Sequence, residues 1–306
     1  MESCIELQHI TKCFGKFKAV NNISLKLAPG KVYGIIGPNG AGKSTTMSII
    51  MGILKPTIGT GNIMGYPLGS KQALAQLGYS PEFTSFYSDM SCLEYLWYMA
   101  TVAGLDNKTA LQRAKELIKQ FELEEYTSKK VAKFSTGMKK KVSLAQAMIT
   151  NPKILLLDEP TANLDPVSRM VILDTVRKMV SDKQLTVLIS SHVLTELETV
   201  IDHVIMIEKG EIILNDNISN AKRRMDQQVY LVESSNNQLL LEKLENKYEY
   251  QQVDNCLRFM VDDATQLKKD LVKVVYENQL QLNKLQEELL SLDSIYKQII
   301  ETEANK

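Results

Sequence analysis

The chain contains 306 residues, 44% of them hydrophobic, and its 36 basic residues are balanced by 36 acidic ones. This is enough apolar material for one large or two smaller domains with buried cores, and the charge balance excludes the overall positive field of a nucleic-acid-binding protein. The four cysteines, at positions 4, 13, 92 and 256, fit neither a zinc site nor a disulfide framework, so we expect free thiols in a reducing cytoplasm.

The start of the chain and its apolar runs predict a protein that does not itself cross a membrane. Residues 1–12 (MESCIELQHITK) alternate in polarity like a strand, which leaves no room for a signal peptide. No apolar run approaches the roughly 18 to 20 residues of a membrane-spanning helix.

Strand-like and helix-like segments alternate along the first two thirds of the chain. The pairs are 32–37 with 44–51, 154–158 with 167–180, and 186–190 with 194–199. This order predicts an α/β fold, a mainly parallel sheet with helices on its faces. The interval 83–151 breaks the rhythm and has an almost wholly helical pattern.

The composition changes near Asn215. Beyond it glycine and proline are absent, glutamine and asparagine are frequent, and strand-like runs at 229–233 and 256–261 alternate with helical patterns. We therefore expect an α/β nucleotide-binding domain at 1–216, with a helical subdomain at about 83–151, and a small α+β domain at 217–306.

The segment GPNGAGKST follows a predicted strand, opens a predicted helix and fits G-x-x-x-x-G-K-[ST] in full. Glycines let backbone N–H groups converge on phosphate oxygens, and the helix dipole favours the anion. Lys43 is expected to reach the β- and γ-phosphates, and the Ser44 hydroxyl to bind Mg²⁺. The alternative, a chance glycine-rich turn, is disfavoured by the strand and helix beside it. The predicted nucleoside triphosphate site comprises Gly37, Pro38, Asn39, Gly40, Ala41, Gly42, Lys43, Ser44 and Thr45.

The segment ILLLDEP supplies two carboxylates at the end of a predicted strand. Its apolar run suits a buried parallel strand, and such strands bind ligands at their carboxyl ends. Asp158 is placed to hold Mg²⁺ through water, and Glu159 to take a proton from the attacking water. Alone, the segment would also fit an ordinary acidic strand end, and the phosphate loop favours the catalytic interpretation.

The segment FSTGMKKKVSLAQAM (134–148) predicts a helix that begins at Met138, preceded by Ser135, Thr136 and Gly137 as cap and loop. Three lysines at a helix start are mildly unfavourable because of the helix dipole. We expect two of them, Lys140 and Lys141, to face solvent.

Together these motifs resemble the ATP-binding subunit of an ABC transporter, over about 5–216. The further motifs stand in the family's order: the signature S-T-G-M with Ser135 and Gly137, the D-loop with Asp165, the switch histidine His192, and Phe14, which matches the aromatic residue that stacks on adenine. Taken singly, His192 would also fit a satisfied polar residue and Phe14 a core aromatic.

The resemblance implies an ATPase that works as a pair of cassettes arranged head to tail. The signature of one cassette caps the γ-phosphate held by the other, so Ser135 and the Gly137 N–H would donate to a nucleotide on a second chain. It also implies integral membrane permease subunits, through which the cassette sits on the inner face of the cell membrane.

The chain departs from the usual family pattern at two sites, and these departures point to one subgroup of the family. The usual signature is S-G-G-Q, whereas Thr136 and Met138 replace its second and fourth members here. Glu82, in GYSPEFTSF, stands where the family usually has glutamine, and a carboxylate there still binds Mg²⁺ or its water. Both replacements resemble ABC-2-type exporters of the bacitracin and daunorubicin kind, which implies export of a drug, peptide antibiotic or lipid-like compound.

Two more segments bear on the partners. Between 83 and 98 stand six aromatic residues, and in the family this segment lines a groove for a helix of the membrane subunit; core packing is the alternative for about half of them. They are Phe83, Phe86, Tyr87, Tyr95, Trp97 and Tyr98.

The tail 217–306 has 12 basic and 15 acidic residues, which argues against binding of nucleic acid. It ends in LLSLDSIYKQII, with Ser291 as a helix cap, which resembles ABC-2 exporter ATPases or is a generic amphipathic helix. We expect an accessory domain that regulates or dimerises the cassette.

Two alternatives of other classes remain open: an ABC ATPase without a transporter, and a regulatory cassette that does not hydrolyse ATP. The single phosphate loop argues against ribosome-associated types, and the short interval from Lys43 to Ser135 against DNA-repair types. Glu159 and His192 argue against a regulatory cassette. The transported substrate is not indicated, because the permease selects it.

Overall fold

The computed structural model describes residues 3–183, 185–223, 228–245, 247–288 and 291–304. The chain divides into two compact units, Met1–Ile218 and Ser219–Lys306. Among the described helices, none has both the length and the hydropathy that a membrane span requires.

The first unit is built on a six-stranded sheet of order β10-β9-β3-β8-β7-β6. Five of these strands are parallel, and β10 pairs antiparallel with β9 at one edge. The strands are β3 (Val32–Ile36), β6 (Leu77–Ser80), β7 (Ile154–Asp158), β8 (Thr186–Ser191), β9 (His203–Glu208) and β10 (Glu211–Asn217). Every residue of β3, β7 and β8 is buried, as their continuous apolar runs predict.

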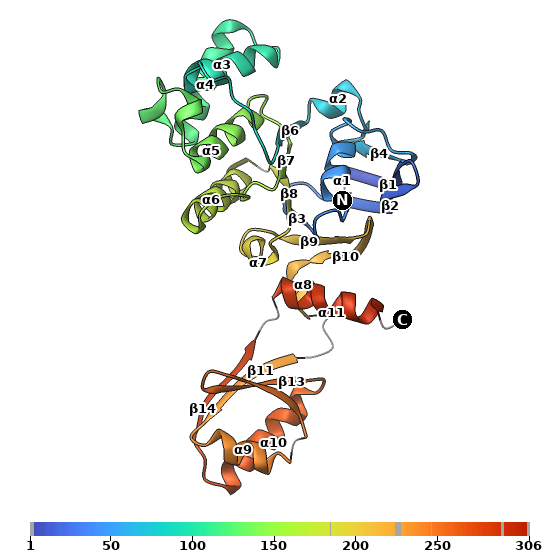
Figure 1. The fold of residues 1–306 in the computed structure, drawn as a ribbon, viewed down its shortest axis with the longest axis vertical. Helices are drawn as coiled ribbons and strands as arrows, with labels where there is room; N and C mark the ends of the chain where they lie inside the picture. Colours follow the sequence, from blue (N-terminus) through green and yellow to red (C-terminus); the bar gives the residue numbers. More distant parts are fainter. Residues whose placement is uncertain (1–2, 184, 224–227, 246, 289–290, 305–306) are drawn as a thin grey trace. The chain divides into compact units, whose positions relative to one another are not determined.

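A second, antiparallel sheet of order β2-β1-β4-β5 lies in the same unit. Its strands are β1 (Ile5–Phe14), β2 (Phe17–Leu27), β4 (Ile58–Ile63) and β5 (Tyr66–Pro67). The sequence pattern predicts the first of them but not the sheet, because register shifts in the β1–β2 pairing interrupt the alternation of polarity. Helix α1 (Lys43–Ile50) lies between the two sheets (Figure 1), and its Met47, Ile49 and Ile50 belong to their shared core.

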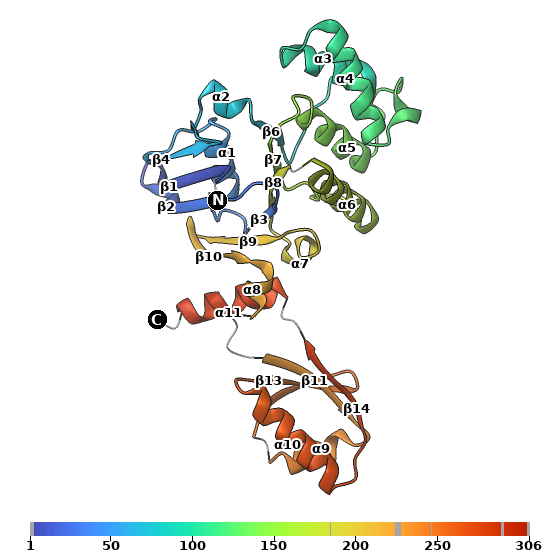
Figure 2. The ribbon, with the colours of Figure 1, turned by 180° about the vertical axis from the view of Figure 1, so that it is seen from behind.

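Helices cover the opposite face of the six-stranded sheet and extend beyond its β6 edge. Figures 1 and 2 show α6 (Pro166–Lys183) and α7 (Leu194–Leu197) on the face away from α1. The predicted helical insert contains α3 (Cys92–Val102), α4 (Asn107–Gln120) and α5 (Thr136–Ala147), with short 3₁₀ turns η1 (Glu124–Tyr126) and η2 (Val131–Lys133). A short α2 (Lys71–Leu74) precedes β6.

Apart from a helix at each end, the second unit has the order β-α-β-β-α-β of a ferredoxin-like domain. Its antiparallel sheet has the strand order β12-β13-β11-β14. The elements are α8 (Ile218–Arg223), β11 (Gln228–Ser234), α9 (Asn237–Lys243), β12 (Glu249–Val253), β13 (Cys256–Val261), α10 (Ala264–Glu277), β14 (Leu282–Glu288) and α11 (Leu292–Ala304). Residues of β11, β13, α9 and α10 share one hydrophobic core, so the expected α+β class is confirmed. Helix α11 begins after Ser291, whose hydroxyl accepts from the Ser294 N–H at 3.2 Å.

Candidate functional site: a phosphate-binding loop and two carboxylates

The segment 37–45 runs from the carboxyl end of β3 into the first turn of α1, which begins at Lys43. Its geometry requires glycine at several positions: a Cβ on Gly37 would lie 2.1 Å from the Ile207 carbonyl oxygen, and Gly40 and Gly42 have φ of 84° and 109°. The N-cap residue of α1 is Gly42, which has no side chain to cap the first turn. The N-terminal N–H groups of such a helix form a binding site for an anion.

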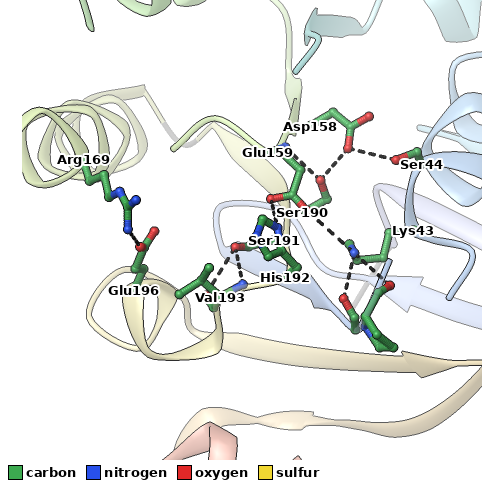
Figure 3. A network of polar contacts seen from close by, with 12 residues as sticks. Lys43, Ser44, Asp158, Glu159, Arg169, Ser190, Ser191, His192, Val193 and Glu196 are labelled. Carbon is green, nitrogen blue, oxygen red and sulfur yellow. Dashed lines mark hydrogen bonds and ion pairs between the residues drawn. The ribbon is translucent and has the colours of Figure 1, made fainter. Parts of the chain in front are cut away.

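Lys43, the first residue of α1, is buried beneath this loop with 5% of its surface exposed. Its Nζ donates to the carbonyl oxygens of Gly37 at 2.7 Å and Pro38 at 3.2 Å. The same ammonium lies 3.6 Å from Glu159 Oε1. It is therefore the cation between the loop and the carboxylates, as Figure 3 shows.

The two buried carboxylates are joined by a serine that sequence reasoning missed. The Ser190 hydroxyl, at the end of β8, donates to Asp158 Oδ1 at 2.5 Å and accepts from the Glu159 N–H at 2.9 Å. Ser44 Oγ donates to the same oxygen of Asp158 at 3.3 Å. A signal was available in the sequence, because Ser190 ends an apolar strand run two residues before His192.

Glu159 has a left-handed backbone, with φ of 45°, a conformation that is unfavourable for a residue with a side chain. Three contacts fix it there: the N–H bond to Ser190, the ion pair with Lys43, and a 2.9 Å contact from Oε2 to His192 Nδ1. The Glu159 side chain is 9% exposed and that of His192 is 46% exposed. The backbone turn thus aims the carboxylate into the space above the phosphate loop.

This space is a cavity of about 460 Å³. Its lining includes most of the predicted phosphate-loop residues together with Phe14, Phe17, Glu82, Glu159 and His192. Phe14 is 49% exposed, and its strand partner across the β1–β2 turn is Phe17, a second aromatic that sequence reasoning did not single out. The cavity therefore offers an exposed aromatic side chain on which a nucleotide base can stack, and the loop 37–45 can bind the phosphates.

The oxygen atoms beside the loop suit Mg²⁺, which prefers hydroxyl, carboxylate and phosphate ligands and is usually held by one or two carboxylates. The Ser44 hydroxyl and the Asp158 carboxylate already touch, and Glu82 lines the same cavity. Within the described residues, no cluster of three or more His, Cys, Asp or Glu forms a complete protein cage for a metal. The donor set therefore fits an ion that is shared with a phosphate.

The remaining predicted residues form a separate group. Ser135 caps α5, accepting from the Met138 N–H at 3.3 Å, and with Gly137 lines a second cavity, of about 270 Å³. Asp165 caps α6, and hydrogen bonds from the Ser168 hydroxyl and N–H lower its pKa. Gly137 lies beside Ser168, since a Cβ on this glycine would be 3.1 Å from the serine oxygen. No described residue lines both this cavity and the phosphate-loop cavity.

Two expectations for the lysine-rich helix are wrong. Helix α5 begins at Thr136 rather than at Met138. Lys140 does not face solvent but is only 8% exposed, because its ammonium donates to backbone carbonyls. Lys141 is also largely covered, at 17% exposed, and pairs with Glu122 at 3.1 Å.

The aromatic residues between 83 and 98 fall into two groups, one buried and one exposed. Tyr95 is buried and packs edge-on against Phe86, with ring centroids 5.1 Å apart. Phe83, Tyr87 and Tyr98 are exposed to 74%, 55% and 38%. Part of the segment is therefore core, and part remains available for contact.

Comparison with known proteins decides the family. A model of the ABC transporter family matches residues 20–162. The bacitracin transport ATP-binding protein BcrA of Bacillus licheniformis is 33% identical over 226 residues, which is 73% of this chain and 73% of that protein. The chain belongs to the ABC transporter family, as an ATP-binding subunit. The prediction from the motifs is confirmed.

Other members of the ABC transporter family extend the comparison. The linearmycin resistance ATP-binding protein LnrL of Bacillus subtilis is 35% identical over 211 residues, covering 68% of both chains. A putative ABC transporter ATP-binding protein of Mycoplasma pneumoniae is 30% identical over 302 residues, covering 97% of this chain and 92% of that one. The latter match includes the second unit.

A solved cassette supports the assignment to ATP-hydrolysing ABC subunits. It is a dimeric ATP-binding cassette in a post-hydrolysis state bound to ADP and phosphate, with a TM-score of 0.62 and 25% identity. The match covers 70% of this chain and 98% of that cassette. The predicted P-loop fold is thereby confirmed, and the chain is an ABC-type ATPase.

Proposed function

We propose that this ABC subunit hydrolyses Mg²⁺·ATP at two composite sites in a head-to-tail pair of cassettes, and that it powers export of a drug, peptide antibiotic or lipid-like compound through membrane permease subunits. The observation that carries the proposal is the separation of the two halves of the site. Lys43 and Glu159 face one cavity, and Ser135 and Gly137 line another. A second cassette would bring the signature of one chain to the phosphate loop of the other.

Each residue of the phosphate-loop half has a role in this proposal. Phe14 stacks on adenine, Lys43 binds the β- and γ-phosphates, and 37–45 supplies backbone donors. Ser44, Asp158 and Glu82 would hold Mg²⁺, which when bound neutralises charge on the phosphates.

Hydrolysis needs a base beside the γ-phosphate. Glu159 takes the proton of the attacking water, a transfer that typically contributes 10²- to 10⁴-fold to a rate (order of magnitude). His192 holds the second oxygen of that carboxylate, at 2.9 Å, and so orients it. Lys43, 3.6 Å away, pairs with Glu159 and would turn to phosphate when nucleotide enters.

The signature half acts on the nucleotide of the partner cassette. The Ser135 hydroxyl and the Gly137 N–H lie at the start of α5, where the helix dipole favours an anion. Asp165 stands at the start of α6, next to the same cavity through Ser168. The γ-phosphate of the partner's ATP would lie against Ser135 and Gly137 at the start of α5.

The partners in transport are inferred from exposed side chains and from relatives. Phe83, Tyr87 and Tyr98 offer exposed aromatic surface for an amphipathic helix of a permease, which would hold the cassette at the inner face of the membrane. Relatives named for bacitracin transport and linearmycin resistance support the class of cargo. The domain 217–306 is proposed to be an accessory domain, regulatory or dimerising.

The test uses a variant that binds ATP but does not consume it. Glu159→Gln keeps the shape of the side chain and removes the base, so ATP persists and joins two chains by mass action. We expect this variant to form an ATP-dependent dimer with Mg²⁺·ATP, and to be a monomer, or a looser dimer joined through 217–306, without it, as measured by light scattering. Adding Ser135→Arg should abolish the ATP-dependent step, because the new side chain occupies the place of the partner's γ-phosphate.

Ser91→Arg in the same Glu159→Gln background is the matched control. Ser91 is also a helix cap, accepting from the Glu94 N–H at the start of α3, but it lies outside both cavities. Dimerisation should survive in this control. ATP-dependent dimerisation that persists with Ser135→Arg would refute the composite site. If no variant associates with ATP, the homodimer is refuted and the partner cassette is a different chain.

A further inference from the structure

Helix α5, which carries the signature at its start, holds the segment 80–84 with two side chains on one of its faces. Lys140 is the first of them. Its Nζ donates to the backbone carbonyl of Glu82 at 2.5 Å and to that of Pro81 at 3.4 Å. Lys140 is 8% exposed, so this contact is made largely out of water.

Ser143, one helical turn further, is the second contact. Its hydroxyl lies 2.8 Å from Ser80 Oγ and 2.7 Å from Thr84 Oγ1. Ser80 and Ser143 are each 1% exposed. The segment 80–84 is thus held at its two ends by Ser143 and in its middle by Lys140.

We propose that Lys140 and Ser143 are positioning residues, a clamp by which the signature helix fixes Glu82 at the metal side of the chain's own nucleotide site. This inference rests on the proposed role of Glu82 as a Mg²⁺-side ligand. Its consequence is a link inside one chain between the two half-sites. A shift of α5, whose start caps the partner's ATP, moves the Glu82 backbone in the same chain.

The surroundings of the Lys140 ammonium fit this role. Burial lowers the pKa of Lys140, and the carboxylates of Glu82, Asp158 and Glu159 oppose that effect. A cation kept out of water is stable only with partners of this kind. The clamp therefore supplies both a donor for the backbone of 81–82 and a positive charge near the acidic groups of the site.

The first readout does not depend on turnover. Lys140→Met keeps the length of the side chain and removes its donors and charge. In the nucleotide-free protein, amide hydrogen exchange of 80–86 should become about tenfold faster than in the wild type, because the segment loses its hydrogen bonds to α5. Ser143→Ala should accelerate the same amides, which keeps the test decisive if Lys140→Met folds poorly.

The second readout is the Mg²⁺ dependence of ATP hydrolysis. Loss of a residue that orients a metal ligand typically weakens metal binding about 10- to 100-fold, so the half-saturating Mg²⁺ concentration should rise by about tenfold or more in Lys140→Met. In a Glu82→Ala background the same substitution should change it by less than about twofold, since groups that act through one another are not additive. Lys115→Met, on the exposed face of α4, is the control for loss of a lysine and should match the wild type.

The outcomes separate the clamp from the function on which it rests. Unchanged exchange of 80–86 in both variants, or an effect of Lys140→Met that adds fully to that of Glu82→Ala, overturns the clamp. A wild-type Mg²⁺ dependence in Glu82→Ala itself overturns the role of Glu82, and hence the proposal built on it. Faster exchange with a non-additive shift in Mg²⁺ dependence supports both.

Discussion

Ser190→Ala is the substitution that tests the architecture of the catalytic half most directly. The wild-type hydroxyl makes two bonds at once, donating to Asp158 at 2.5 Å and accepting from the Glu159 N–H at 2.9 Å. Ser190 is fully buried, with 0% of its surface exposed. Alanine removes one oxygen atom and leaves both partners without it.

The size of the effect follows from the two lost bonds. A buried N–H left without an acceptor costs about 1–3 kcal/mol, and a hydrogen bond to an ionised carboxylate contributes about 1.5–3 kcal/mol. Both hydrogen bonds involve the same Ser190 oxygen, so their two energies do not add fully. We expect a loss of about 2–4 kcal/mol in the free energy of unfolding of the first unit. Because Glu159 also loses a constraint on its left-handed backbone, ATP turnover should fall by about 10²-fold, as for displaced catalytic groups.

Urea unfolding followed by tryptophan fluorescence reports on the first unit, because the single tryptophan of the chain is Trp97 in α3. Ser191→Ala is the matched control. It is the same change on the next residue, which is also buried, and among the described residues its hydroxyl hydrogen-bonds to the backbone of Val193. We expect the control to lose about 1 kcal/mol and to keep its turnover within a few-fold. If the free energy of unfolding of Ser190→Ala is within about 0.5 kcal/mol of the wild-type value, and the variant hydrolyses ATP at the wild-type rate, then the serine does not organise the carboxylates.

Three further expectations concern the phosphate site and the second unit. Lys43→Ala should weaken Mg²⁺·ATP binding by about 2–5 kcal/mol in titration calorimetry, because it removes a desolvated cation; unchanged affinity would contradict the site. Glu82→Gln should keep ATP turnover within about tenfold of the wild type, while Glu82→Ala should lose more, since the amide oxygen still reaches Mg²⁺; equal rates in all three proteins would place Glu82 outside the site. Hydrogen bonds from Lys247 and then Tyr248 lower the pKa of Asp270 to about 2. The stability from this carboxylate is present above its unfolded-state value of 3.8 and is lost as pH falls through about 2. Asp270→Asn should therefore destabilise the second unit above pH 4 (roughly) and progressively less towards pH 2, in melts followed by circular dichroism; a difference independent of pH would refute this.

Local sequence determined the phosphate loop and the fold class. All the loop's residues lie within 37–45, and the geometry that they impose, a strand end, glycine turns and a helix start, is set by neighbours in the chain. The buried strands β3 and β7 follow equally from uninterrupted apolar runs. The order of the motifs was then enough to identify an ABC cassette.

Only the tertiary structure decided which distant side chains meet. Ser190 reaches Asp158 because β8 pairs with β7 in a register that sets these two residues side by side. Lys140 reaches Glu82 because α5 docks beside β6. The buried position of Lys140 had one signal in the sequence: it shares a helical stripe with Leu144 and Ala147, at spacings of four and seven residues. Its charge suggested solvent instead, and charge alone does not tell which carbonyls a folded chain presents.

In the second unit, too, some strands follow from the local sequence pattern and others only from pairing with a neighbouring strand. The central strands β11 and β13 alternate between buried and more exposed residues, and the sequence predicted both. The edge strands β12 and β14 were missed, since all of β12 and most of β14 is exposed and no apolar face marks them. They are strands because their backbones complete the hydrogen bonding of β13 and β11. A pattern in the sequence records which side chains are buried, whereas the pairing of an edge strand depends on backbone groups that every residue carries.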